Sequence, residues 1–549
     1  MTSPSGRRDG FVPFPVERAQ RYREAGLWAG RTVDSLLRDA ARRWPQRTAV
    51  ADSSTRLSFD EVDRAADRVA SALHHRGVRR GERMLLQLPN TARFPVAFFG
   101  LLRAGIIPVM CLPGHRGGEL GHFATVSDAV GLIVADRAAG FDYRPMAAEL
   151  TLTHPGLRHV VVDGDPGEFT AWSELVDFDG AAPDPAEAGV VDTAAPALLL
   201  VSGGTTGYPK LIPRTHDDYV YNATASAALC RLTGDDVYLA TLPAAHNFPL
   251  ACPGLLGAVS VGATTVLLSD PSPESAFATI AAEGVTVTAL VPALAKLWSQ
   301  ACDWEPVLPT TLRLLQVGGA KLGAEDAAAV RAALPAARLQ QVFGMAEGLL
   351  NYTRLDDSDD LLDRTQGRPL SEADEIAVVD ETGTEVAAGT EGELMVRGPY
   401  TINGYFNAEA VNRQSFSADG FYRTGDKVRR SADGYLEVTG RVKDVIHRAG
   451  ETVSALDLEE HLLTHPAIWN VAVVALPDAY LGEKICAAVV FRAQTATLAQ
   501  LHRFLDQRGV AAYARPDLLT PMSSLPTTAV GKVDKKAIIS ALTHGAQSV

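Results

Sequence analysis

The stretch PALLLVSGGTTGYPK, residues 196–210, joins an apolar run to a loop rich in glycine and threonine. The run at residues 196–201 predicts a buried strand. In the loop, glycines let backbone amides approach an anion, hydroxyls add donors, and a lysine adds positive charge. We therefore expect a phosphate-binding loop made of Ser202, Gly203, Gly204, Thr205, Thr206 and Lys210. It is not a Walker A loop, because Lys210 follows Pro209 and precedes Leu211.

Strand and helix patterns alternate on both sides of this loop. AVGLIVAD at 129–136 and HVVVDG at 159–164 are apolar runs that end in turn residues, whereas DEVDRAADRVASALHHRG at 60–77 has helical periodicity. Such alternation is typical of a layered α/β fold with largely parallel sheets.

A chain of 549 residues exceeds the size of one hydrophobic core, so we expect at least two domains. Residues 1–440 should form a large N-terminal domain of layered α/β subdomains. Residues 441–549 should form a smaller, mobile α+β domain. In it, LDLEEHLLTHP at 456–466 and TLAQLHRFLDQRG at 497–509 predict helices, while NVAVVALPD at 470–478 and ICAAVVFR at 485–492 predict strands.

Composition excludes several functional classes. The net charge of -14 argues against a general binder of nucleic acid or anionic membranes. The most apolar stretch, 95–112, carries Arg103 and two glycines, and the N-terminus lacks the apolar segment of a signal peptide, so no membrane insertion is expected. The five cysteines form no CxxC pair, which fits a reducing cytoplasm.

Six further motifs follow the phosphate loop in order: FGMAEG (343–348), GRPL (367–370), GELMVRGPY (392–400), FYRTGD (421–426), GRVKDVIHRAGETV (440–453) and PTTAVGKVDKKAI (526–538). Together with SGGTTGYPK they resemble the acyl-adenylate-forming superfamily, which includes acyl-CoA synthetases, luciferases and peptide-synthetase adenylation domains. The resemblance covers most of the chain, and it implies ATP as a substrate.

The resemblance also implies roles for residues around the nucleotide. Glu347 matches the carboxylate that holds Mg²⁺, a cation that prefers oxygen ligands. Asp426 matches the acid that accepts both ribose hydroxyls, and Arg441 matches a further ribose contact. The adenine would lie against a wall made of Gly318, Gly319, Ala320, Val342, Phe343 and Gly344.

Two lysines near the predicted domain boundary and the C-terminus carry the remaining implied roles. Lys443 occupies the hinge position of the family, about which the small domain would rotate. Lys532 resembles the catalytic lysine that bridges the attacking carboxylate and the α-phosphate. The neighbouring Lys535 and Lys536 are expected to form a solvated helix start.

The segment PAAHNFPLACPG, residues 243–254, resembles the aryl-acid-activating branch that feeds siderophore assembly. Amino-acid-activating relatives usually carry an aspartate at the position of Asn247, because a buried α-ammonium needs a charged partner. A neutral Asn247 can instead hydrogen-bond a phenolic hydroxyl ortho to the carboxylate. His246 would lie beside the reacting carboxylate, and Phe248 and Leu350 would pack the ring.

Cys252 bears on the choice between two aryl acids. A serine at this position in 2,3-dihydroxybenzoate enzymes can hydrogen-bond a 3-hydroxyl more strongly than a thiol can. Cys252 therefore favours salicylate, although a small core residue without a role in selectivity is the alternative.

The sequence thus predicts ATP- and Mg²⁺-dependent activation of salicylate, with Lys532, His246 and Glu347 in catalytic roles. No phosphopantetheine-serine motif follows Lys532, so the expected acceptor is a separate aryl carrier protein or a carrier domain of a peptide synthetase. Three alternatives stay open: a 2,3-dihydroxybenzoate-AMP ligase, an aryl-CoA ligase, and an adenylate-binding regulator without turnover.

Overall fold

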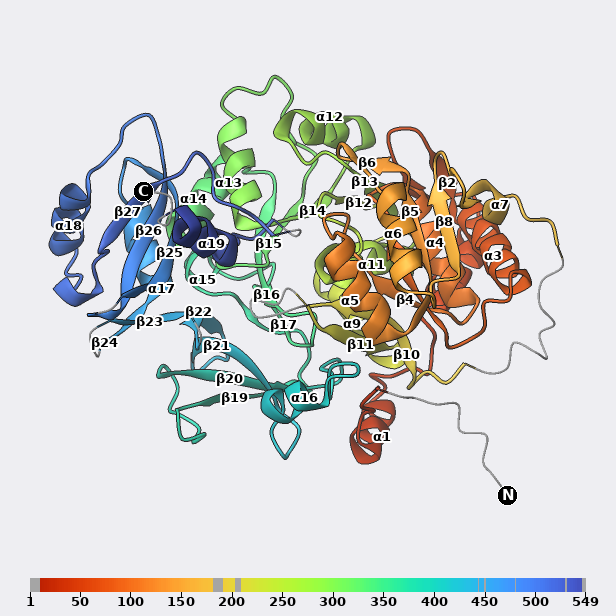
Figure 1. The fold of residues 1–549 in the computed structure, drawn as a ribbon, viewed down its shortest axis with the longest axis horizontal. Coiled ribbons are helices and arrows are strands. Elements are labelled where there is room, and N and C mark those ends of the chain that lie inside the picture. Colours follow the sequence, from red (N-terminus) through yellow and green to blue (C-terminus); the bar gives the residue numbers. More distant parts are fainter. Residues whose placement is uncertain are drawn as a thin grey trace. The chain divides into compact units, whose positions relative to one another are not determined.

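The computed structural model describes residues 10–180, 191–202, 209–442, 444–448, 451–478, 480–528 and 531–545. The chain divides into two compact units, each made of more than one segment. The first unit comprises Met1–Asp363, Gly367–Glu375 and Val396–Tyr422, and the second comprises Arg364–Gln366, Ile376–Met395 and Arg423–Val549. Figure 1 traces both units as a succession of helices and strands.

One sheet of the first unit holds seven strands among the described residues, in the order β11-β10-β4-β3-β5-β8-β9. Its strands are β3 (Arg83–Gln87), β4 (Ile107–Met110), β5 (Ala129–Ala135), β8 (His159–Asp163), β9 (Thr170–Ala171), β10 (Pro196–Val201) and β11 (Leu211–Thr215). All neighbours are parallel except β10 and β11. The predicted strands at 129–136, 159–164 and 196–201 are confirmed as β5, β8 and β10.

A second sheet of this unit holds nine strands in the described part of the chain, ordered β18-β17-β16-β15-β14-β12-β13-β1-β2. The strands are β1 (Thr48–Ala51), β2 (Arg56–Ser58), β12 (Val237–Ala240), β13 (Thr264–Leu267), β14 (Val287–Leu290), β15 (Leu314–Gly318), β16 (Arg338–Gly344), β17 (Leu350–Tyr352) and β18 (Arg368–Pro369). The pairs from β16 through to β1 are parallel, and antiparallel strands close both edges.

Helices cover these sheets (Figure 1). The helices of the first unit are α1 (Val16–Glu24), α2 (Asp34–Arg43), α3 (Phe59–His75), α4 (Arg93–Arg103), α5 (Gly117–Ser127), α6 (Arg144–Thr153), α7 (Ser173–Val176), α9 (His216–Leu229), α10 (Asn247–Ala251), α11 (Gly254–Val261), α12 (Pro273–Glu283), α13 (Pro292–Ala301), α14 (Ala324–Ala333), α15 (Asp359–Arg364), which ends at the edge of the unit, and α16 (Glu409–Ser415). A short hairpin pairs β6 (Arg137–Ala138) with β7 (Phe141–Asp142). On the seven-stranded sheet, Leu85 and Val109 pack with Phe123 of α5 and Leu150 of α6.

Among its described residues, the second unit contains a five-stranded sheet of β23 (Val445–Arg448), β24 (Glu451–Ser454), β25 (Ile468–Asp478), β26 (Gly482–Phe491) and β27 (Leu518–Pro521). Alternate residues of β26 point to opposite faces. Ile485 and Val489 join the core beneath α17 (Ala455–Leu463) and α18 (Leu498–Gln507), whereas Cys486 and Ala488 pack with Ile538 of α19 (Lys535–Gly545). A 3-10 turn, Ala512–Ala514, lies between α18 and β27.

In the described part of the chain, a four-stranded sheet of β19 (Glu375–Val379), β20 (Glu391–Arg397), β21 (Tyr422–Arg430) and β22 (Leu436–Arg441) precedes it. The predicted α/β class, with a smaller C-terminal α+β part, is confirmed. The exact boundary between residues 440 and 441 stays a prediction. Within the described residues, no helix is long and apolar enough to cross a membrane.

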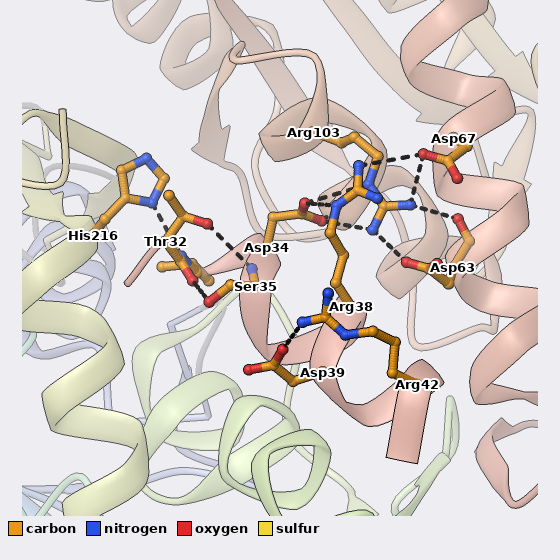
Figure 2. A network of polar contacts seen from close by, with 11 residues as sticks. Thr32, Asp34, Ser35, Arg38, Asp39, Arg42, Asp63, Asp67, Arg103 and His216 are labelled. Atoms are coloured by element: carbon orange, nitrogen blue, oxygen red, sulfur yellow. Dashed lines mark hydrogen bonds and ion pairs between the residues drawn. The ribbon is translucent and has the colours of Figure 1, made fainter. Parts of the chain in front are cut away.

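The lone arginine of the most apolar stretch joins three helices of the first unit (Figure 2). The Arg103 side chain is only 4% exposed, and its guanidinium lies 2.9 Å from Asp34 of α2, 2.5 Å from Asp63 and 3.0 Å from Asp67 of α3. Burial by itself would lower the pKa of Arg103, but these carboxylates raise it overall. The charge is therefore retained inside the helix layer and holds α2, α3 and α4 together.

His216, at the start of α9, accepts a hydrogen bond at Nδ1 from the backbone N–H of Val33, 3.1 Å away (Figure 2). Burial lowers the pKa of His216 to about 4, with a smaller contribution from the positive charge of Arg80. The folded protein thus holds this imidazole neutral over a pH range in which an unfolded chain protonates it. Because the unfolded state then binds more protons, stability must fall as the pH drops from about 6.5 towards 4.

We predict that His216→Gln weakens the loss of stability in acid. Between pH 7 and pH 5 the wild type should lose about 2 kcal/mol of unfolding free energy through this histidine alone, and glutamine, which can still accept from Val33, does not titrate. Urea denaturation at the two pH values measures the difference. His74→Gln, at an exposed position of α3, is the matched control. An unchanged pH dependence in His216→Gln would contradict the assignment.

Candidate active site

The predicted phosphate loop connects two antiparallel strands, β10 and β11. Its ends are fixed to each other: the Ser202 N–H donates to the Lys210 carbonyl at 2.9 Å, and the Lys210 N–H donates to Ser202 Oγ at 2.9 Å. Gly203, Gly204, Thr205 and Thr206 lie outside the described residues. The two described members of the predicted loop are therefore held together at the base of a hairpin.

The predicted adenine wall forms where two parallel strands end. Gly318 of β15 pairs with Val342 of β16, and a Cβ at Gly318 would lie 2.6 Å from the Val342 carbonyl oxygen. Gly319 has φ +87°, which favours glycine. Ala320, the residue after Gly319, is exposed. Residues 342–344 form the end of β16. Carboxyl ends of parallel strands are common ligand sites in open α/β sheets, so the wall lies where such a site is expected.

The predicted ring-packing residues meet this wall. The Phe248 ring lies 3.1 Å from the position a Cβ would take at Gly318. Leu350 of β17 pairs with Gly344 of β16, and its Cδ2 would lie 2.6 Å from a Cβ there. The structure thus brings residues from two distant motifs together, although they are about 100 positions apart in the sequence.

His246 and Asn247 begin the short helix α10. His246 is the N-cap, and its Nδ1 accepts from the Phe248 N–H at 3.3 Å. Asn247 is buried, with Oδ1 2.9 Å from the Tyr219 hydroxyl and Nδ2 3.4 Å from Cys252 Sγ. Nothing in the sequence distinguished Tyr219 from the other residues that α9 buries.

Cys252 follows α10 and is fully enclosed. Burial raises the pKa of its thiol to about 12, so the sulfur keeps its proton. The thiol donates to the backbone carbonyl of Asn247 at 3.4 Å and accepts from the Asn247 side chain. Cys252 therefore contacts the predicted ortho-hydroxyl partner directly, while its predicted role in selecting salicylate stays a prediction.

Glu347 is buried in the loop after β16. Its Oε1 accepts from the Tyr405 hydroxyl at 2.8 Å, and the Tyr405 and Tyr422 oxygens are 3.0 Å apart. The Lys210 ammonium lies 5.3 Å from the centroid of the Tyr405 ring. Burial, followed by the negative charge of Glu347, strongly raises the pKa of Tyr405. Lys210 and Glu347 thus approach the same tyrosine, which the sequence reasoning did not identify.

A single carboxylate suits Mg²⁺ at this place. No group of three or more Asp, Glu, His or Cys side chains able to hold a metal occurs among the described residues. Mg²⁺ keeps several waters and takes one or two carboxylates together with substrate phosphates. Glu347 gives one oxygen to Tyr405, and its second oxygen is of the type that Mg²⁺ prefers.

Arg214 of β11 contacts the neighbours of both Glu347 and Asn247. Its side chain is fully buried, with Nε 2.8 Å from Asp218 Oδ1. The guanidinium also donates to the carbonyls of Ala346 at 3.0 Å and Tyr400 at 3.2 Å, and it lies over the Tyr219 ring at 4.7 Å. In the sequence, the one feature that could have pointed to Arg214 is its place as an arginine within the strand LIPRT, residues 211–215.

In the second unit, Asp426 and Arg441 face each other across β21 and β22, and Arg441 Nε donates to Asp426 Oδ1 at 2.7 Å. Asp426 is 6% exposed. The two predicted ribose contacts are therefore paired, and one of the Asp426 oxygens is already engaged. The predicted hinge residue Lys443 lies outside the described residues.

Lys532 lies in a turn closed by hydrogen bonds in both directions with Thr528: the Thr528 N–H donates to the Lys532 carbonyl at 2.7 Å, and the Lys532 N–H donates to Thr528 Oγ1 at 3.3 Å. The expectation of a solvated Lys535 is wrong. Its Nζ lies 2.9 Å from Glu459 Oε1 of α17 and 3.3 Å from Asp444 Oδ2, and the adjoining helix α19 packs through Ile538 on β25 and β26. Lys536 is exposed, as expected.

Comparison with protein families identifies the chain. The AMP-binding enzyme model matches residues 37–406, and the AMP-binding enzyme C-terminal domain matches residues 457–532. The chain belongs to the AMP-binding enzyme family. Its predicted membership of the acyl-adenylate-forming superfamily is thereby confirmed.

Several relatives match this AMP-binding enzyme over almost its whole length. A salicyl-AMP ligase / salicyl-S-ArCP synthetase from Mycobacterium tuberculosis is 65% identical, covering 98% of this chain and 95% of the relative. A 2,3-dihydroxybenzoate-AMP ligase from Bacillus subtilis is 45% identical, covering 97% and 98%. The solved apo structure of MbtA from Mycobacterium smegmatis has 66% identity and a TM-score of 0.76, covering 97% and 98%.

For this AMP-binding enzyme we predict that Arg214→Met lowers the unfolding free energy of the first unit by about 3–5 kcal/mol, because Asp218 is left buried and unpaired. Arg47→Met is the control. Arg47 pairs at 3.0 Å with Asp235, which is 94% exposed, and such surface pairs contribute about 0–1 kcal/mol. Urea denaturation followed by tryptophan fluorescence measures both, and equal losses would contradict the supporting role of Arg214.

Proposed function

We propose that the protein activates salicylate as salicyl-AMP, at the expense of ATP, and transfers the salicyl group to the phosphopantetheine thiol of an aryl carrier protein. The observation that carries this proposal is the buried, uncharged carboxamide of Asn247 beside Phe248. The 65% identity to a salicyl-AMP ligase / salicyl-S-ArCP synthetase supports it. We place the reaction in siderophore biosynthesis and in the cytoplasm, because the aryl-acid branch that the sequence resembles supplies that pathway.

Asn247 sets the class of acid. A buried α-ammonium group would need a charged partner, and an amide cannot supply one. A phenolic oxygen next to the carboxylate can instead accept from Asn247, while the ring packs on Phe248 and Leu350. His246, half-buried at the start of α10, is then near the carboxylate that reacts.

In the first half-reaction an oxygen of salicylate attacks the α-phosphorus of ATP, and pyrophosphate leaves. We propose that the loop from Ser202 to Lys210 holds the phosphates and that Glu347 binds Mg²⁺. The metal ion, when bound, neutralises charge on the phosphate oxygens. Lys532 would stabilise the charge that develops between the carboxylate and the α-phosphate.

The nucleoside is assigned to two further groups of residues. The adenine would stack on the wall of Gly318, Gly319, Ala320, Val342, Phe343 and Gly344, since small residues leave room for a flat base. The ribose hydroxyls would bind Asp426, which keeps one carboxylate oxygen beyond its bond to Arg441.

In the second half-reaction the carrier thiol attacks the acyl carbon, the thioester forms, and AMP leaves. A bulky carrier thiol and ATP need different groups around one carbonyl. We therefore propose that the second domain changes its orientation about Lys443 between the two steps. A carrier domain of a peptide synthetase is an equivalent acceptor.

Coenzyme A is the alternative acceptor. A relative from a Streptomyces species, named salicylyl-CoA synthase / salicylate adenylyltransferase, is 45% identical and covers 99% of both chains. Comparing coenzyme A with a phosphopantetheinylated carrier protein as acceptor separates the two functions.

The proposed substrate predicts the outcome of a pyrophosphate-exchange assay. Salicylate should exceed benzoate in kcat/KM by about one to two decades, because benzoate leaves the buried Asn247 amide without its partner, at a cost of roughly 1–3 kcal/mol. With Cys252 in place of a serine, 2,3-dihydroxybenzoate should rank below salicylate. Equal use of salicylate and benzoate would remove Asn247 from this role. If none of the aryl acids supports pyrophosphate exchange, the proposed function is refuted.

Lys532→Ala should reduce salicyl-adenylate formation by about 10²–10³, by analogy with the loss of one preorganised donor. Transfer from preformed salicyl-AMP to the carrier should be much less affected. Lys443→Pro should show the opposite pattern, because proline restricts φ at the hinge. Lys536→Ala, at an exposed position, is the control. Equal losses of both half-reactions in both variants would contradict the division of labour.

A further inference from the structure

Asn247 presents either a donor or an acceptor to a bound acid, depending on how its carboxamide is turned. The two ends of that group differ in one respect: the oxygen only accepts and the nitrogen only donates. In a dry pocket the difference decides which ortho substituent can bind. The neighbours of Asn247 therefore determine more than its position.

Two contacts orient the carboxamide in the same sense. The Tyr219 hydroxyl lies 2.9 Å from Asn247 Oδ1, and Cys252 Sγ lies 3.4 Å from Asn247 Nδ2. The Cys252 thiol can donate to the Asn247 backbone carbonyl, 3.4 Å away, and its sulfur then accepts from the Asn247 side chain. In this arrangement the nitrogen faces the sulfur and the oxygen faces the Tyr219 hydroxyl, which is the stronger donor of the two neighbours.

Tyr219 is a dependable donor in this position. Its side chain is fully buried, and burial raises its pKa well above the usual value, so the phenol stays protonated. The Arg214 guanidinium 4.7 Å from the ring holds the ring in place. With Oδ1 given to Tyr219 and one N–H given to Cys252, the second N–H of Asn247 is the group left for a ligand.

We infer that Tyr219 is a positioning residue that makes Asn247 a donor towards the acid and thereby selects an ortho hydroxyl over an ortho amine. This inference rests on the proposed function. In salicylate the hydroxyl donates its proton to the adjacent carboxylate, so its oxygen accepts from Asn247. In anthranilate one N–H serves the carboxylate and the other points outward, while the nitrogen lone pair is conjugated with the ring. Two donors then face each other.

The test is pyrophosphate exchange with salicylate, anthranilate and benzoate in the wild type and in Tyr219→Phe, which keeps the ring that packs on Arg214. The wild type should prefer salicylate to anthranilate by about 10²-fold in kcat/KM, the size expected when a buried polar group is left mispaired. In Tyr219→Phe the carboxamide loses its phenol donor and keeps only the weaker contact with the Cys252 thiol, so it can turn over. The ratio should fall about tenfold, through slower use of salicylate and faster use of anthranilate, while benzoate changes less than twofold.

Tyr238→Phe is the matched control. Tyr238 of β12 is equally buried, and its hydroxyl has no hydrogen-bond partner among the described residues. It should leave the salicylate-to-anthranilate ratio unchanged, because a merely structural loss lowers all three acids together.

Three outcomes would overturn the inference: a wild type that uses salicylate and anthranilate equally, a ratio in Tyr219→Phe within twofold of the wild type, or an equal fall in Tyr238→Phe. Each leaves the proposed function standing. Failure of the wild type to exchange pyrophosphate with any of these acids would instead overturn the proposed function.

Discussion

The buried guanidinium of Arg214 is the interaction on which the candidate site depends. Arg214 belongs to β11, the strand that follows the predicted phosphate loop, and its guanidinium pairs with Asp218 at 2.8 Å. Its remaining donors reach the carbonyls of Ala346 and Tyr400, and it lies over the Tyr219 ring. One charge thus links the phosphate hairpin, the loop that carries Glu347 and the support of the aryl pocket. Breaking a buried pair is costly, which makes these parts rigid with respect to one another.

The surroundings of Asn247 in the proposed aryl pocket show how a neutral amide can be oriented by its neighbours. The Asn247 carboxamide lies between a phenol that donates and a sulfur that accepts. Its orientation is therefore set by hydrogen bonds and not by packing alone. A buried polar group left mispaired is costly, so in this setting the choice between donor and acceptor matters. In the inference drawn here, selectivity for the substrate depends on Tyr219, a residue outside the family's sequence motifs.

The second unit repeats this use of buried charge. Lys535 connects α19 to Glu459 of α17 and to Asp444, the residue after the predicted hinge. Burial raises the pKa of Glu459, and the nearby Lys535 ammonium opposes that shift. Through these pairs, the segment just after Lys532 is tied to the segment just after Lys443. The two elements proposed to act in different half-reactions are therefore mechanically connected within one compact unit.

The sequence by itself determined the fold class, most of the strands and helices that it predicted, and the family. Apolar periodicity and ordered motifs are local properties, so β5, β8, β10, α3 and the elements around β25 and β26 could be recognised without a partner. It also assigned Gly318 and Val342 to the nucleotide and Phe248 and Leu350 to the aryl ring. Only the tertiary structure decided what holds them: the ends of β15 and β16 bring Phe248 against Gly318, Tyr219 bonds to Asn247, Tyr405 bonds to Glu347, and Arg214 reaches the carbonyl of Ala346. The orientation of a carboxamide and the burial of Lys535 depend on residues distant in the chain, and no pattern along the sequence records such contacts.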